Sequence, residues 1–300
     1  MTSEQFHRYR DLVVRAREAA GPFDLDAMRE RLDQIGGELP DGAALAWRHL
    51  GGVRVGIVTP DAAPDDAVVL YLHGGGYVAG SVRSHLALVG ALAVAIGCRV
   101  VVPEYRLAPE HPHPAALDDA LAVYRALEVE RSNARIGVMG DSAGGGLAAA
   151  LLVRLREAGS AQPEIGVLLS PWLDLTNDSP SRRSRADVDP AVTVAETEVM
   201  SAAYLAGADP RVPLVSPVGA DLAGLAPMLV QVGDAEVLLD DSVRFADGVA
   251  TAKGEVELEV WPEMIHVWHA AVGHVPEADR AIERIAAFAR PRLGLNASPS

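Results

Sequence analysis

The chain has little cysteine, no long apolar run and no apolar signal core. Its single cysteine, Cys98, excludes an intrachain disulfide and a cysteine metal cluster. No run of residues reaches the length of a membrane span, and Met1–Arg17 carries Glu, Arg, His and Asp instead of a signal sequence. The sequence therefore predicts a cytoplasmic globular protein without stable membrane insertion.

Positive charge is also scarce. Against 41 acidic residues stand 26 basic ones, which gives a net charge of -15. This balance disfavours nucleic acid and anionic membranes as partners, so a small neutral or cationic molecule is the expected ligand. With 300 residues, 49% hydrophobic and 22% charged, the chain can bury a large core.

Apolar runs and helical patterns alternate along the chain. Several runs are apolar throughout, as strands buried on both faces are. The alternation predicts an α/β fold with a mostly parallel central sheet flanked by helices. Strands are predicted at Val53–Val58, Ala67–Leu72, Arg99–Val102, Arg135–Met139, Ile165–Leu169, Met228–Val232 and Glu255–Val260. Helices are predicted at Ser84–Ile96, Pro114–Val129, Ala143–Ala158, Asp240–Ala252 and Glu277–Leu293.

Two segments interrupt this alternation. Residues 1–45 indicate two polar helices, and residues 177–212 contain a polar loop and a helix, Glu196–Ala206. Extra helices joined by a polar loop are typical of a lid, although they could equally cover a sheet face. The predicted organisation is a core in two parts, 46–176 and 213–300, with 1–45 and 177–212 as additions.

A serine lies at the sharpest predicted turn. Gly140-Asp141-Ser142-Ala143-Gly144 follows an apolar strand and begins a helix rich in Ala and Leu. A G-x-S-x-G sequence in this setting is typical of a nucleophile elbow, in which the glycines allow close packing and the serine hydroxyl is exposed. We expect Asp141 to brace the elbow by hydrogen bonds. Ser142 is the candidate nucleophile for attack on a carbonyl.

Donors for an oxyanion are expected in His73-Gly74-Gly75-Gly76, directly after a predicted strand. Glycines let backbone N–H groups approach a substrate oxygen that a Cβ would block. The N–H of Ala143, at the start of a helix, is a further candidate donor.

Nine histidines compete for the role of base: His7, His49, His73, His85, His111, His113, His266, His269 and His274. Hydrolases of this topology have the chain order serine, acid, histidine, which leaves the last three. His266 is preferred because it follows a strand in a loop from which it can reach Ser142. His269 is an alternative base, or a partner of His266 in a metal site, but no H-E-x-x-H pattern or cysteine pair accompanies them.

The acid is expected just beyond the predicted strand Met228–Val232. Asp234 and Glu236 both lie there, and either could accept the Nδ1–H of His266 and stabilise its imidazolium.

With these residues in view, the chain resembles the hormone-sensitive-lipase-like (bacterial family IV) carboxylesterases of the α/β-hydrolase fold. The likeness extends from about residue 65 to 290, and four stretches in family order carry it. They are His73-Gly74-Gly75-Gly76-Tyr77, Tyr105-Arg106-Leu107-Ala108-Pro109-Glu110-His111-Pro112, Gly140-Asp141-Ser142-Ala143-Gly144-Gly145 and Ser170-Pro171-Trp172-Leu173-Asp174-Leu175.

The resemblance implies a serine carboxylesterase acting on short- to medium-chain acyl esters, with no metal or organic cofactor. It implies a helical cap formed by 1–45 and 177–212, and it is compatible with a homodimer. The family pattern Asp-Pro-Leu-x-Asp, aligned here on Asp240, favours Glu236 over Asp234 as the acid. The site residues implied by the resemblance are Ser142, His266, Glu236 and the oxyanion donors Gly74, Gly75 and Ala143.

Two other functions fit the same residues. One is a non-catalytic protein that binds a small ligand on this scaffold, which the retained His266 disfavours. The other is a hydrolase of amides, thioesters or lactones, whose reactions pass through a similar tetrahedral state.

Overall fold

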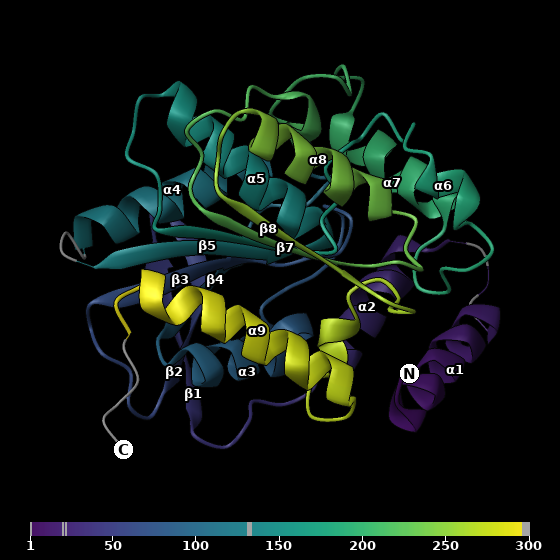
Figure 1. Cartoon of the computed structure of the whole chain (residues 1–300), viewed down its shortest axis with the longest axis horizontal. Coiled ribbons are helices and arrows are strands. Elements are labelled where there is room, and N and C mark those ends of the chain that lie inside the picture. The colour runs from purple at the N-terminus through teal and green to yellow at the C-terminus, as the bar shows by residue number, and fades with distance from the viewer. Residues whose placement is uncertain (1, 20, 22, 131–133, 296–300) are drawn as a thin grey trace.

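One mixed β-sheet forms the centre of the structure (Figure 1). The computed structural model describes residues 2–19, 21, 23–130 and 134–295. In these residues eight strands are arranged in the order β1-β2-β4-β3-β5-β6-β7-β8. β1, β2 and β4 pair antiparallel, and the pairs from β4 to β8 are parallel. The strands are β1 Ala43–Leu50, β2 Val53–Pro60, β3 Ala67–Leu72, β4 Arg99–Pro103, β5 Arg135–Asp141, β6 Ile165–Leu169, β7 Met228–Gly233 and β8 Val256–Trp261.

Helices cover both faces of this sheet (Figure 1). On one face lie α4 (Ala115–Glu130), α5 (Ser142–Glu157) and α8 (Leu239–Thr251), and on the other lie α3 (Leu86–Ile96) and α9 (Pro276–Arg292). This architecture confirms the predicted α/β class. Short 3₁₀ segments occur at Arg83–His85, Pro217–Gly219 and Trp268–Ala271.

The buried strands supply side chains to both faces. In β3, Val68, Leu70 and Leu72 belong to the apolar cluster that includes α4, α5 and α8. The alternate residues, Ala67, Val69 and Tyr71, belong to the cluster formed with α3 and α9. Since side chains alternate along a strand, a central strand covered on both faces must be apolar at every position.

Four further helices lie at the end of the sheet where its parallel strands finish (Figure 1). They are α1 (Glu4–Ala19), α2 (Leu25–Ile35), α6 (Ser181–Ser184) and α7 (Val194–Leu205). The N-terminal helices contact residues 177–212, the insertion between β6 and β7: Arg17 of α1 donates to Glu196 Oε2 at 2.6 Å and to Thr193 Oγ1 at 3.0 Å. The two segments that interrupt the sequence pattern therefore meet in space.

The structure differs from the sequence prediction in β1 and in α7, and it has the short helix α6 where a polar loop is predicted. β1 begins at Ala43, where the sequence indicates only polar helices, because this edge strand is largely exposed and has no apolar alternation. α7 begins at Val194, two residues before its predicted start. Its Thr193 and Glu196 form a reciprocal capping box, a T-x-x-E pattern that defines the helix start.

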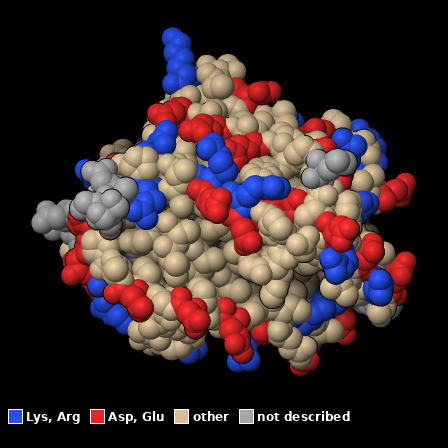
Figure 2. All heavy atoms as spheres, turned by 60° about the horizontal axis from the view of Figure 1, so that its bottom comes forward, with Lys and Arg blue, Asp and Glu red and all other residues tan. Residues whose placement is uncertain are grey.

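Acidic and basic side chains are interspersed over the side that is lowest in Figure 1 (Figure 2). α9 forms ion pairs of this kind, between Arg284 and Glu259 and between Arg292 and Glu255. No helix in the described residues combines the length and the apolar character needed to cross a membrane.

Candidate active site

Ser142 lies at a strained turn between β5 and α5. Its φ is 52°, in the left-handed region that residues other than glycine seldom adopt. The two glycines of the turn have no room for a side chain: a Cβ on Gly140 would meet Gly144 O at 2.3 Å, and one on Gly144 would meet Leu72 O at 2.0 Å. The strand, turn and helix predicted for a nucleophile elbow are thus present.

The Ser142 hydroxyl lies against the imidazole of His266, which follows β8. Ser142 Oγ is 2.9 Å from His266 Nε2, and His266 Nδ1 is 3.0 Å from Oε2 of Glu236, which follows β7. Because an ionised carboxylate only accepts hydrogen bonds, Nδ1 carries the hydrogen and Nε2 of the neutral ring accepts from the serine. The ends of three strands thus bring together a hydroxyl, a base and an acid.

The environment of His266 favours its protonated form. Burial opposes a charge there, but the hydrogen bond and the charge of Glu236 outweigh burial, and the pKa of His266 is raised above its usual value. Asp189 and Asp141 act in the same direction. The site therefore stabilises the imidazolium that forms when a base takes a serine proton.

The buried carboxylate of Glu236 is held at both oxygens. Oε1 accepts hydrogen bonds from Gly233 N at 2.6 Å and from Ser170 Oγ at 2.7 Å, which leaves Oε2 for His266. Ser170 also accepts from Val267 N at 3.1 Å, next to the histidine. It therefore joins the acid loop (residues 234–238, after β7) to the histidine loop (residues 262–267, after β8). The sequence identified Ser170 only as part of a shared motif. Its position after a buried strand, like that of the acid, is the signal that could have revealed it.

The other candidates at this edge of the sheet have different partners. Asp234 Oδ1 accepts from Glu263 N at 2.7 Å and so braces the loop that leads to His266. His269 Nε2 lies 3.0 Å from Gln231 Oε1, and burial lowers the pKa of His269 to about 3. Of the alternatives left open by the sequence, the structure brings Glu236 and His266, but not Asp234 and His269, into the chain of contacts with Ser142.

The glycine loop after β3 requires a correction to the predicted oxyanion donors. The amide of Gly74 donates to Asp141 Oδ1 at 2.9 Å, so it is already occupied. Among the residues that the structure describes, no acceptor takes the amide hydrogens of Gly75, Gly76 or Ala143. Gly75 and Gly76 have φ values of 116° and 63°, which suit glycine. The available set is therefore Gly75, Gly76 and Ala143, with Gly74 excluded.

Asp141 holds the glycine loop rather than the elbow alone. Besides the Gly74 amide it accepts from Tyr71 OH at 2.8 Å, and it lies 3.2 Å from His85 Nε2. Burial would raise the pKa of Asp141, but the charge and hydrogen bond of His85 outweigh it and lower that pKa. Tyr105 OH donates to His73 O at 2.6 Å, which fixes the start of the same loop.

The family model for the alpha/beta hydrolase fold matches residues 69–270, which contain this whole constellation. The chain belongs to the α/β-hydrolase family. An acetyl-hydrolase of Streptomyces hygroscopicus is 45% identical over 264 residues, which are 85% of this chain and 88% of that protein.

Solved structures assign this α/β hydrolase to the hormone-sensitive-lipase-like branch. An esterase from the bacterial hormone-sensitive lipase family is 41% identical, with a TM-score of 0.94, and the match covers 98% of this chain and 100% of that one. The structure of EstE5 soaked with p-nitrophenyl butyrate is 36% identical, with a TM-score of 0.92 and coverage of 97% and 99%.

In this α/β hydrolase, α7 of the insertion packs on the glycine loop. A Cβ on Gly76 would lie 2.1 Å from Met200 Sδ, and Tyr204 stacks on Tyr77 with ring centroids 3.9 Å apart. α2 reaches the same loop, since Arg29 Nε donates to Val78 O at 2.8 Å. Both additions to the core therefore contact the segment that carries the free amides.

Proposed function

We propose that this α/β hydrolase is a serine carboxylesterase that hydrolyses short- to medium-chain acyl esters through an acyl-enzyme. The observation that carries the proposal is the contact series from Ser142 Oγ through His266 to Glu236, at 2.9 Å and 3.0 Å. The relatives support the ester as substrate, because one is named an acetyl-hydrolase and another an esterase.

In the proposed first half-reaction, Ser142 Oγ attacks the carbonyl carbon of the ester while its proton passes to His266 Nε2. The amides of Gly75, Gly76 and Ala143 donate to the oxyanion, and Glu236 stabilises the imidazolium. When the tetrahedral intermediate collapses, the bond to the alcohol oxygen breaks, and His266 gives its proton to the leaving alcohol. The acyl group is then esterified to Ser142.

In the second half-reaction, water attacks the acyl carbon and His266 takes its proton. Collapse returns that proton to Ser142 Oγ and releases the carboxylic acid, so the enzyme ends as it began. No metal or organic cofactor enters either step.

A cap formed by residues 1–45 and 177–212 belongs to the same proposal. Its support is the ion pair between α1 and the start of α7, together with the contacts of Arg29 and Met200 with the glycine loop. Such a cap would enclose the acyl chain close to Ser142 and limit its length, which is why short and medium chains are proposed.

The experiment compares p-nitrophenyl acetate, butyrate and palmitate as substrates of the wild type and of Ser142→Ala. We expect turnover of acetate and butyrate well above that of palmitate, and a loss in kcat of at least about 10⁴-fold in the variant. A fluorophosphonate should label the wild type at Ser142. Undiminished turnover by Ser142→Ala would refute the nucleophile. A wild type that neither turns over nor is labelled would indicate a ligand-binding protein.

A further inference from the structure

The insertion contributes a buried acid that lies against the acid loop of the site. Asp189, between α6 and α7, is 4% exposed. Its Oδ2 accepts from Val237 N at 3.1 Å, and its Oδ1 accepts from Ala191 N at 2.9 Å. Val237 directly follows Glu236, so Asp189 is joined to the peptide next to the proposed acid.

The insertion also holds the carbonyl of Val237. Ser181 Oγ donates to Val237 O at 2.7 Å, and Asp240 N donates to Ser181 Oγ at 3.1 Å. Val237 therefore has its amide bound by Asp189 and its carbonyl bound by Ser181, both from the insertion.

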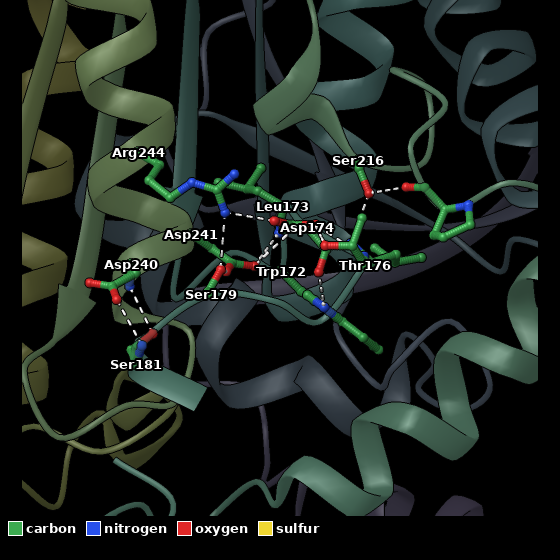
Figure 3. A network of polar contacts seen from close by, with 12 residues as sticks. Trp172, Leu173, Asp174, Thr176, Ser179, Ser181, Ser216, Asp240, Asp241 and Arg244 are labelled. Atoms are coloured by element: carbon green, nitrogen blue, oxygen red, sulfur yellow. Dashed lines mark hydrogen bonds and ion pairs between the residues drawn. The ribbon is translucent and has the colours of Figure 1, made fainter. Parts of the chain in front are cut away.

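The start of the insertion is anchored to α8 by a polar network (Figure 3). Ser181 N donates to Asp240 Oδ2 at 2.7 Å, and buried Asp241 accepts from Ser179 Oγ and from Asp174 N. Arg244 donates to Asp174 Oδ2 at 2.6 Å. With its start fixed in this way, the insertion can place Asp189 reproducibly.

Asp189 also faces the charged pair of the site. Glu236 and His266 act on it from the core, and on its own segment Asp189 N donates to Arg185 O, while Asp187 is exposed. Burial first, and then the charge of Glu236, raises the pKa of Asp189 to about 6, against the attraction of His266. Above that pH the charge of Asp189 therefore acts on the imidazole as that of a third carboxylate, beside Glu236 and Asp141.

We infer that Asp189 is a positioning residue of the active site, which holds the acid loop through the Val237 amide and stabilises the imidazolium of His266 from the insertion. The basicity of His266 then depends on how the insertion is seated on the core. This inference rests on the proposed function, because it concerns the base of that reaction.

The test is the pH profile of kcat/KM for p-nitrophenyl butyrate, whose acidic limb reports the base of the free enzyme. Without a negative charge at position 189, His266 loses its proton more readily. We expect the midpoint of the acidic limb to move to lower pH by about half a pH unit in Asp189→Asn. kcat should fall about 10-fold, because the asparagine side chain has only one acceptor oxygen for the two amides of Val237 and Ala191. Asp187→Asn, two residues away and exposed, is the matched control and should match the wild type.

Asp189→Ser is a second charge-free variant, whose hydroxyl can still accept the Ala191 amide. Asp189→Glu retains the charge, so its acidic limb should stay nearer to the wild type even where kcat falls. The inference would be overturned if the acidic limbs of Asp189→Asn and Asp189→Ser coincided with that of the wild type. It would also be overturned if neither variant folded, since the role of Asp189 would then be structural. Loss of the proposed function is distinguishable, because the wild type itself would show no turnover.

Discussion

At the proposed acid position this chain carries a glutamate, one methylene longer than aspartate. The extra length is accommodated because Oε1 is held by Gly233 N and Ser170 Oγ, while Oε2 reaches His266. The loop thus turns back to its own strand end before the carboxylate meets the imidazole. A shorter side chain at position 236 would have to give up one of these two sets of contacts.

Glu236→Gln should lower kcat by about 10³- to 10⁴-fold, because a neutral amide neither enforces the productive tautomer nor stabilises the imidazolium. Asp234→Asn should stay close to wild type, since an amide oxygen can still accept from Glu263 N. Turnover of p-nitrophenyl butyrate by the two purified variants, with thermal melts to verify folding, makes the comparison. A severe loss in Asp234→Asn alone would reverse the assignment.

The oxyanion donors show the limit of sequence reasoning at this scale. The run of three glycines identifies the loop, because only backbone without Cβ can approach a substrate this closely. Which amides are free depends on Asp141, a residue distant in sequence whose carboxylate takes the amide of Gly74. The role of Asp189 is not predictable from the sequence for the same reason, since it depends on contacts between segments that lie far apart along the chain.

Among the elements, α2 packs Leu25, Met28 and Leu32 on the core, and Arg29 makes the most hydrogen bonds between this helix and the core. Arg29 donates to Val78 O and Ala108 O and forms a two-pronged pair with Glu110. The ion pair is partly exposed, with 27% and 53% of the two side chains accessible, so it contributes little. The two carbonyls belong to buried residues, and leaving them without donors costs more.

Arg29→Gln should therefore destabilise the fold by about 1–3 kcal/mol, the cost of unpaired carbonyls. Glu110→Gln, which weakens the ion pair but keeps both carbonyl bonds, should cost less than about 1 kcal/mol. Arg31→Gln, on an exposed position of the same helix, is the control. Urea unfolding monitored by fluorescence gives the three values. Equal losses in the Arg29 and Glu110 variants would mean that the ion pair, and not the carbonyls, secures α2.

Across the whole molecule, the sequence predicts the elements that carry a regular apolar pattern. It does not predict the exposed edge strand or the placement of the insertion, which have no such pattern. The buried strands β3, β5, β6 and β7 were predictable because both their faces are covered. The edge strand β1 was not, because water on its surface removes the pattern. The position of the insertion over the strand ends depends on polar contacts such as Ser181 with Asp240, for which a single sequence has no periodic signal.

Buried titratable groups make two opposing contributions to the pH dependence of the free energy of unfolding. Burial lowers the pKa of His73 and His269 to about 3. Below the usual pKa of a histidine the unfolded chain therefore binds more protons than the folded chain, and the free energy of unfolding falls as the pH drops. Burial raises the pKa of Asp189 and Asp241 to about 6, so between the usual aspartate value and that pH the folded chain binds more protons. The contribution of these two carboxylates to the free energy of unfolding falls as the pH rises. Over about pH 4–6 it therefore opposes the contribution of the two histidines.

Asp241→Asn removes one of the raised carboxylates and leaves both histidines. The free energy of unfolding should then rise with pH more steeply than in the wild type across pH 4–6, by up to about 1.4 kcal/mol per pH unit. A constant loss from altered hydrogen bonds to Leu173 N or Asp174 N would shift the whole curve without changing this slope. Asp247→Asn, exposed on the same helix, should leave the slope unchanged. Urea unfolding at a series of pH values supplies both curves, and parallel curves for Asp241→Asn and the wild type would show that Asp241 is not protonated in the folded state within this range.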